Sequence, residues 1–214
     1  MLLLRILSMG AILCSFAYTA IAADTGLAIN TTDIIAYGDD LTAGAHVAKG
    51  RGYPASLERE LHMMGHFDIR IINEGRSNFN SHYALKHINI ITRKQPRIVL
   101  LQVGYNDILQ KQTANKIYYN IAKAINIFGK NKIGVILIGT SPPDNYPEEY
   151  KKKINGMYQY IAKKHKVPLY PDFFKVLENH PEYYNEDGLL PNQRGYKAIS
   201  SDLAQFIQRT IYKR

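Results

Sequence analysis

Two neighbouring acidic residues, Asp39 and Asp40, follow a short apolar run and precede a stretch of helical composition, in the sequence AYGDDLTAG at 36–44. Many hydrolases hold their nucleophile at a sharp turn between a buried strand and a helix. A carboxylate at this place is a weak nucleophile toward an ester, and Asp39 is expected to hold the turn by hydrogen bonds. Two interpretations therefore stay open: an enzyme with unusual chemistry at Asp40, or an enzyme fold that no longer does chemistry.

The elements that must position Asp40 alternate between short apolar runs and segments with helical spacing. The apolar runs predict strands at 34–37, 69–72, 98–103, 135–138 and 167–170. Apolar stripes predict helices around 57–64, 117–128, 150–161 and 196–207, the third opened by Pro147. This alternation predicts an α/β fold, a three-layer α/β/α sandwich around a central five-stranded parallel sheet. We expect one domain over residues 24–214.

Ligands bind such sheets beyond the carboxyl ends of the strands, so the loops at those ends, together with the segment before the last helix, are the place to search. Four of them are unusual in composition. They read GDDLTAG at 38–44, NEGRSNFNS at 73–81, GYNDIL at 104–109 and EDGLLPNQRGY at 186–196.

These loops, in this order, resemble the four sequence blocks of the SGNH (GDSL) hydrolases, and the chain looks like the bacterial periplasmic thioesterase I/lysophospholipase L1 (arylesterase) group. The similarity runs from about Asp33 to the C-terminus. It implies the flavodoxin-like SGNH-hydrolase fold and cleavage of esters or thioesters by a serine, a histidine base, an orienting aspartate and an oxyanion hole. It implies neither a metal nor a cofactor.

Carried over position by position, the resemblance is incomplete. Asp40 stands in place of the serine and Leu190 in place of the histidine. Asn106 matches the oxyanion asparagine, and Asp187 matches the orienting aspartate. Asn78 falls where the second block has a glycine, and Tyr146 is expected to line the acyl-binding groove or to pack locally. We take Asp40, Asn106 and Asp187 as the family-equivalent catalytic positions, and Asn78, Tyr146 and Leu190 as substrate-binding positions.

The side chain of Leu190 cannot accept a proton, and loss of triad members lowers turnover by factors of thousands. We predict that the Asp40 carboxylate faces Asn106 and fills the place of a substrate oxyanion.

Other arrangements stay open at this stage. His46, His82 or His180 could supply a relocated base. Asp40 and Asp187 could act as a carboxylate pair, or could hold a divalent cation together with Asn106. Asp187 could instead cap a turn or pair with Arg194, which we favour.

Residues 1–23 have the pattern of a secretory signal peptide: an early Arg5, an apolar stretch and small residues before the cleavage point. An uncleaved anchor is the alternative. The single cysteine, Cys14, lies in this leader, so the mature chain would have neither disulfide nor thiol nucleophile. Both features favour a periplasmic or secreted bacterial protein.

The formal net charge is +9, and loss of Arg5 with the leader leaves +8. This surplus favours contact with an anionic membrane surface. The sequence has no basic motif interleaved with aromatic residues, so we do not expect it to bind nucleic acid. We expect a monomer. The function predicted is that of an exported esterase-like protein without hydrolysis that binds an acyl, lipid or other ligand. The alternative is an active ester or thioester hydrolase with a rearranged site.

Overall fold

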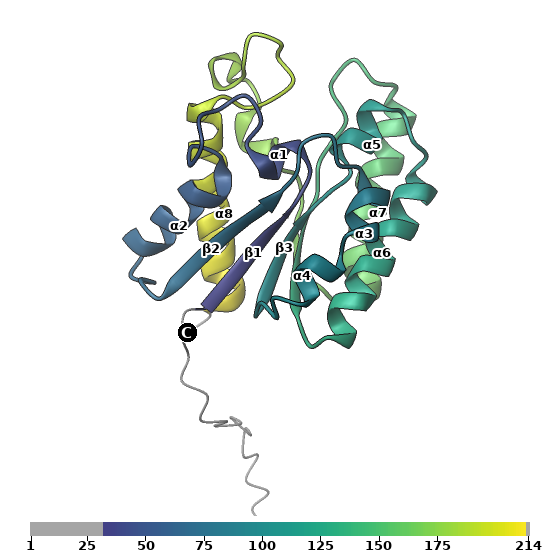
Figure 1. Ribbon diagram of the computed structural model, residues 1–214. Coiled ribbons are helices and arrows are strands. Elements are labelled where there is room, and N and C mark those ends of the chain that lie inside the picture. The colour runs from purple at the N-terminus through teal and green to yellow at the C-terminus, as the bar shows by residue number, and fades with distance from the viewer. Residues whose placement is uncertain (1–31, 213–214) are drawn as a thin grey trace, which may run out of the picture.

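The computed structural model describes residues 32–212, which form a three-layer sandwich with a parallel sheet between two layers of helices (Figure 1). The strands are β1 (Thr32–Gly38), β2 (Ile69–Gly75), β3 (Ile98–Gln102), β4 (Gly134–Ile138) and β5 (Leu169–Tyr170). All four neighbouring pairs are parallel, and the order is β2-β1-β3-β4-β5. This is the flavodoxin-like order, so the predicted fold class is confirmed.

The eight α-helices of the described part vary widely in length. They are α1 (Asp40–Ala43), α2 (Tyr53–Met63), α3 (Ser81–Lys86), α4 (Asn89–Thr92), α5 (Tyr105–Leu109), α6 (Ala114–Lys130), α7 (Glu148–His165) and α8 (Gln193–Ile211). Two 3-10 turns, Lys175–Leu177 and Pro181–Tyr183, precede α8. The four long helices confirm the predicted ones, although Pro147 caps α7 instead of lying inside its first turn. Of the four short helices, α1 was expected after the turn at Asp40 and is confirmed. The other three are too short to show an apolar period, so the sequence did not predict them.

The central strand β3 and its neighbour β4 are almost wholly apolar because helices cover both faces of the sheet. The edge strand β2 also carries polar side chains, those of Arg70, Asn73 and Glu74. On one face α2 and α8 pack over the sheet, and their Leu57 and Leu203 are fully buried beside Ile34. On the other face α6 and α7 do the same, with Ile117 and Phe128 buried against it. Burial of a side chain of this size contributes about 1.5–3 kcal/mol, so these two interfaces provide most of the stability of the fold.

The predicted leader, residues 1–23, lies outside the described residues. Within residues 32–212, no helix has both the length and the apolar character needed to cross a bilayer.

Two glycines at the carboxyl ends of β1 and β2 let α1 lie directly on the sheet. Gly38 and Gly75 are register partners. A Cβ at Gly75 would come within 2.2 Å of the Ala43 backbone nitrogen, and one at Gly38 within 2.0 Å of the Gln102 carbonyl oxygen. Because both obstacles are backbone atoms, only glycine fits. This contact sets the position of α1 and hence of Asp40, its first residue.

We predict that Gly75→Ala lowers the free energy of unfolding by roughly 2 kcal/mol or more, because α1 must move away from β2. Gly156→Ala is the matched control: it lies within α7, and a Cβ there meets no atom within 4 Å. That variant should be more stable than the wild type by about 0.5–1 kcal/mol. Urea unfolding of both variants measures the difference, and equal stabilities would contradict the close approach of α1.

Candidate functional site

The site lies at the carboxyl ends of β1, β2 and β3, at the end of the molecule where α1 and α5 begin (Figure 1). Only Asp39 separates the end of β1 from α1, which starts at Asp40. The helix α5 starts at Tyr105, the residue before Asn106. The loop after β2 lies beside them because β1 pairs with both β2 and β3. Three of the four blocks identified in the sequence therefore meet at one point.

Asp39 connects the first of these segments to the third. Its carboxylate is fully buried and accepts hydrogen bonds from the backbone N–H groups of Leu41 at 3.2 Å, Gly104 at 3.1 Å and Tyr105 at 3.0 Å. The bond to Leu41 caps the N-terminus of α1, so the prediction that Asp39 holds the turn by hydrogen bonds is confirmed. The bonds to Gly104 and Tyr105 were not predicted, and they fix the start of α5 relative to α1.

The Asp40 carboxylate points at the third block. Its Oδ2 accepts a hydrogen bond from the Asn106 side-chain amide and another, at 3.0 Å, from the backbone N–H of Asn78. The predicted contact between Asp40 and Asn106 is therefore confirmed. The Asn106 amide also donates to the Phe79 carbonyl oxygen at 2.7 Å, so both its hydrogens are directed at acceptors.

Asn78 contributes its backbone N–H, while its side chain is exposed. Its φ is +63°, in the left-handed region that glycine and asparagine adopt most readily. This conformation turns the N–H toward Asp40. The family pattern has a glycine here, and asparagine is the substitute with the least backbone cost.

A second buried carboxylate, Asp107, holds the loop that carries Asn78. It accepts from the Ser81 backbone N–H at 2.6 Å and from the Ser81 hydroxyl at 2.8 Å. Asn120 on α6 donates to the same hydroxyl at 2.9 Å. The sequence analysis missed this network. The signal for it was a charged residue between the apolar residues of GYNDIL, a pattern that indicates a paired buried acid.

The fourth block places Asp187 and Leu190 differently from a catalytic pair. Asp187 Oδ1 accepts from the backbone N–H groups of Leu189 at 2.8 Å and Leu190 at 3.4 Å, so this side chain caps a turn as favoured above. The Nδ1 atom of His46 lies 3.8 Å from Asp187 Oδ2, and within residues 32–212 Asp187 forms no ion pair with Arg194. Leu190 is only 7% exposed and packs in the core of the α8 face.

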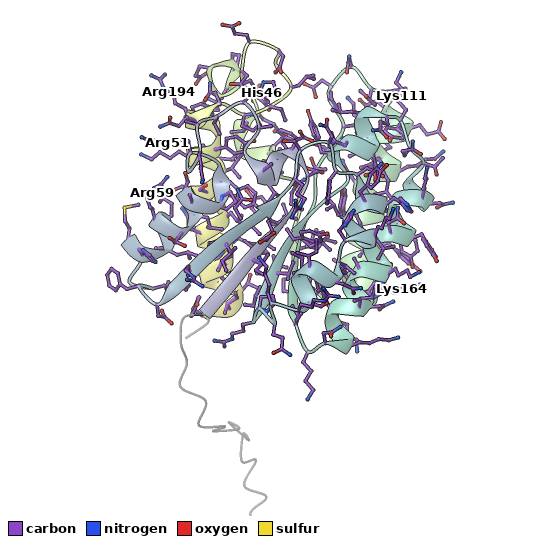
Figure 2. All side chains as sticks on the ribbon, viewed as in Figure 1. His46, Arg51, Arg59, Lys111, Lys164 and Arg194 are labelled. Carbon is purple, nitrogen blue, oxygen red and sulfur yellow. The ribbon has the colours of Figure 1, made fainter. Side chains whose placement is uncertain are left out.

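The three candidate histidines lie in different surroundings. Only His46 contacts a family-equivalent position, and its side chain is 57% exposed at the same end of the molecule as Arg194 (Figure 2). His82 packs edge-on against Tyr83, and His180 pairs with Glu182 at 2.9 Å. Within residues 32–212, no histidine nitrogen is in hydrogen-bond range of the Asp40 carboxylate. The same range holds no group of three or more His, Cys, Asp or Glu residues placed to bind a metal ion.

A cleft of about 840 Å³ opens beside Tyr105, the residue before Asn106. Tyr105 closes one side of it by donating from its hydroxyl to the Leu189 carbonyl oxygen at 2.7 Å. Its walls include the stacked rings of Phe174 and Tyr184. Four carboxylates also line it, those of Asp144, Asp172, Glu178 and Glu186. Tyr146 is not part of this lining: its hydroxyl donates to the Leu109 carbonyl oxygen at 3.3 Å, so it packs locally.

The sheet order and the cluster of donors beyond β1, β2 and β3 define an SGNH-hydrolase type of α/β sandwich. The model of the GDSL-like lipase/acylhydrolase family matches residues 36–198, and the chain belongs to this family.

Two bacterial relatives match most of the chain. An arylesterase of Vibrio mimicus is 26% identical over 80% of this chain and 86% of the relative. The thioesterase 1/protease 1/lysophospholipase L1 of Escherichia coli K12 is 26% identical over 91% of this chain and 88% of the relative. Among solved structures, the SGNH-hydrolase family esterase AlinE4 is 28% identical, with a TM-score of 0.70 over 85% of this chain and 97% of that one. The crystal structure of TesA has a TM-score of 0.78 at 21% identity, over 83% of this chain and 98% of that one.

Burial raises the pKa of Asp39 from 3.8 to about 7, although its backbone hydrogen bonds act in the opposite direction. The folded state therefore binds this proton more tightly than the unfolded state. The resulting stabilisation is complete below pH 3.8 and is lost as the pH rises through 7.

We predict that the free energy of unfolding falls more steeply between pH 4 and 7 in the wild type than in Asp39→Asn, whose amide does not titrate. The variant should also be less stable by about 1–3 kcal/mol, since its amide nitrogen must face a backbone N–H. Denaturant unfolding across this pH range measures both effects, and parallel pH profiles would argue against a buried, proton-binding Asp39.

Proposed function

We propose that this chain is an exported, non-hydrolytic member of the GDSL-like lipase/acylhydrolase family that binds an acyl or lipid ligand in its cleft. The observation that carries the proposal is the position of Asp40. Its carboxylate accepts hydrogen bonds from the Asn78 N–H and the Asn106 amide, the two groups that match the oxyanion donors of the family.

Ester cleavage through a serine requires a base that takes the proton of the nucleophile. Position 40 has no hydroxyl group, and position 190 has a buried leucine with no nitrogen. An attack by the Asp40 carboxylate would give an anhydride, and its resolution needs a positioned base and water. The remaining family-equivalent acid, Asp187, has one oxygen engaged by the backbone of its own turn.

The negative charge at Asp40 also opposes the transition state. A tetrahedral intermediate places an oxyanion at the donors that the carboxylate already occupies. Two unit charges 4 Å apart repel by about 4 kcal/mol at an effective dielectric constant of 20. The site would therefore lose both the donors and the favourable potential on which hydrolysis depends.

Binding does not require this chemistry, and the cleft beside Tyr105 supports it. Its aromatic walls suit an apolar chain, while its four carboxylates disfavour an anionic head group. A neutral acyl compound or a lipid with a neutral or cationic head group fits this combination. Export rests on the pattern of residues 1–23. An anionic membrane surface is a partner favoured by the net charge of +8 that remains after loss of Arg5 with the leader.

One observation favours a second candidate, an active hydrolase with a relocated base. His46 Nδ1 lies 3.8 Å from Asp187 Oδ2, so an aspartate that matches the orienting position of the family does face an imidazole. In that arrangement His46 would activate a water molecule instead of a serine.

We predict that the purified protein does not hydrolyse a short p-nitrophenyl ester or an acyl thioester above background. Asp40→Ser combined with Leu190→His should gain turnover, because it restores a nucleophile and a base around donors that are already in place. Each single variant should gain less than a tenth of that turnover, since the two groups act as a unit. Stopped assays with product quantification measure all four proteins.

Wild-type hydrolysis that disappears in Asp40→Ala would refute the non-hydrolytic function. Hydrolysis that survives in Asp40→Ala but disappears in His46→Gln would establish the second candidate. His82→Gln is the matched control, because His82 is another histidine of the same region and does not contact Asp187.

A further prediction concerns the occupied donors. Asp40→Ala should bind butyrate at least about tenfold more tightly than the wild type, because two hydrogen-bond donors become free and a repelling charge is removed. Ligand-observed NMR titration measures both affinities. Equal affinities would show that the Asp40 carboxylate does not block these donors.

A further inference from the structure

A second concave surface lies at the opposite end of the sheet, where β3, β4 and β5 begin and α6, α7 and α8 end. It is a groove of about 700 Å³. None of its lining residues belongs to the four sequence blocks, so the groove is separate from the site around Asp40.

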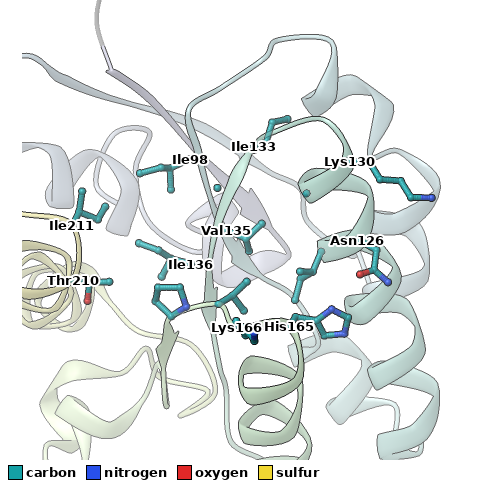
Figure 3. A pocket seen from close by; sticks show the side chains of 15 residues that line it. Ile98, Asn126, Lys130, Ile133, Val135, Ile136, His165, Lys166, Thr210 and Ile211 are labelled. Carbon is teal, nitrogen blue, oxygen red and sulfur yellow. The ribbon is translucent and has the colours of Figure 1, made fainter. Parts of the chain in front are cut away.

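The floor of the groove is apolar, and its rim is polar and basic. Floor residues from the starts of the strands and the ends of the helices are Ile98, Ile125, Ile133, Val135, Ile136, Val167, Pro168 and Ile211. The polar side chains that line it are those of Asn126, Lys130, His165, Lys166 and Thr210. Figure 3 shows Ile98, Val135 and Ile136 together at the floor, while Lys130 extends outward from α6.

The cations of this rim have no anionic partner in the described part of the chain. Neither Lys130 nor Lys166 forms an ion pair within residues 32–212, and no acidic residue of that range lines the groove. The Nε2 atom of His165 is buried without a hydrogen-bond partner. A ligand with an alkyl chain and an anionic head suits this surface, because the chain can lie on the apolar floor while the head pairs with the cations.

Helix capping explains part of this composition, because lysines near the ends of α6 and α7 complement the negative ends of the helix dipoles. Lys166 itself is the C-cap residue of α7, with a φ of +54°. Lys111 and Lys132 adopt the same left-handed conformation. The lack of an acidic partner within residues 32–212, and not the backbone conformation, is therefore what points to a ligand.

The two ends of the sheet differ in charge. The cleft beside Tyr105 is lined by four carboxylates and, within residues 32–212, by no lysine or arginine. The groove has two lysines and no acid from the same range. An amphiphile with a negative head is therefore attracted to the groove and repelled from the cleft. The groove volume lies within the range of about 300–1,000 Å³ typical of small-molecule sites, which suits a single alkyl chain.

We propose that this groove binds a single-chain fatty acid, with the alkyl chain on the floor of isoleucine and valine side chains and the carboxylate at Lys130 and Lys166. The site does not depend on the proposed function of the Asp40 region, since none of its residues takes part there. It would give the protein an amphiphile site at the amino ends of its strands.

The experiment compares three C12 probes: dodecanoate, dodecyltrimethylammonium and dodecyl maltoside, each below its critical micelle concentration. Isothermal titration calorimetry should show dodecanoate binding at least tenfold more tightly than the other two. Chemical shifts of the methyl groups of Ile98, Val135 and Ile211 should move on addition of dodecanoate. Equal affinity for the three probes, or shifts confined to residues around Asp40, would overturn the proposal.

Two variant pairs make the test specific. Gly129 lines the groove and a Cβ there meets no atom within 4 Å, so Gly129→Trp should fill the groove and weaken dodecanoate binding at least tenfold. Gly156→Trp, an equally open position away from the groove, should change the affinity less than twofold.

The charge pair is Lys130→Gln with Lys166→Asn, where asparagine tolerates the left-handed backbone. The affinity of this double variant for dodecanoate should also fall at least tenfold. Lys152 lies on the exposed face of α7, and Lys152→Gln should leave the affinity unchanged. Loss of affinity in the control variants equal to that in the groove variants would overturn the proposal.

Discussion

The buried carboxylate of Asp39 is the interaction on which the whole site depends. It joins the N-terminus of α1 to that of α5 by accepting three backbone N–H groups. Asp40 and Asn106 are the residues that follow these contacts directly, so the distance between their side chains is set by Asp39 and by the two glycines beneath α1. Burial of this acid carries a desolvation cost, which shows as its raised pKa. The hydrogen bonds of the same carboxylate hold the two loops in a fixed relation.

A fixed cluster of N–H donors needs an acceptor whether or not the site is catalytic. In this chain the acceptor is the Asp40 carboxylate, and the helix N-terminus favours its charge. The same geometry that stabilises an oxyanion in a hydrolase thus stabilises an aspartate here. At the other end of the sheet, Lys130 and Lys166 of the groove have no ion-pair partner within residues 32–212, and an external anion is the partner that we propose.

The layered fold followed from the sequence because its signal is periodic. Strands covered on both faces are continuous apolar runs, and long amphipathic helices repeat at 3.6 residues, so both appear within a short window such as 98–102 or 117–128. The convergence of three loops on one point also followed, since carboxyl ends of neighbouring parallel strands meet. Short helices such as α3 and α4 were not predictable, because one turn leaves no period.

The sequence by itself determined which groups are present at the decisive positions: a carboxylate at 40, an amide at 106 and a hydrocarbon at 190. The chemistry of those groups is a property of the residue and does not change with the fold. Only the tertiary structure decided which partners they meet, namely the Asn78 N–H for Asp40 and His46 for Asp187. Such pairs lie far apart in the chain, and their distances depend on how whole elements pack, which no local pattern records.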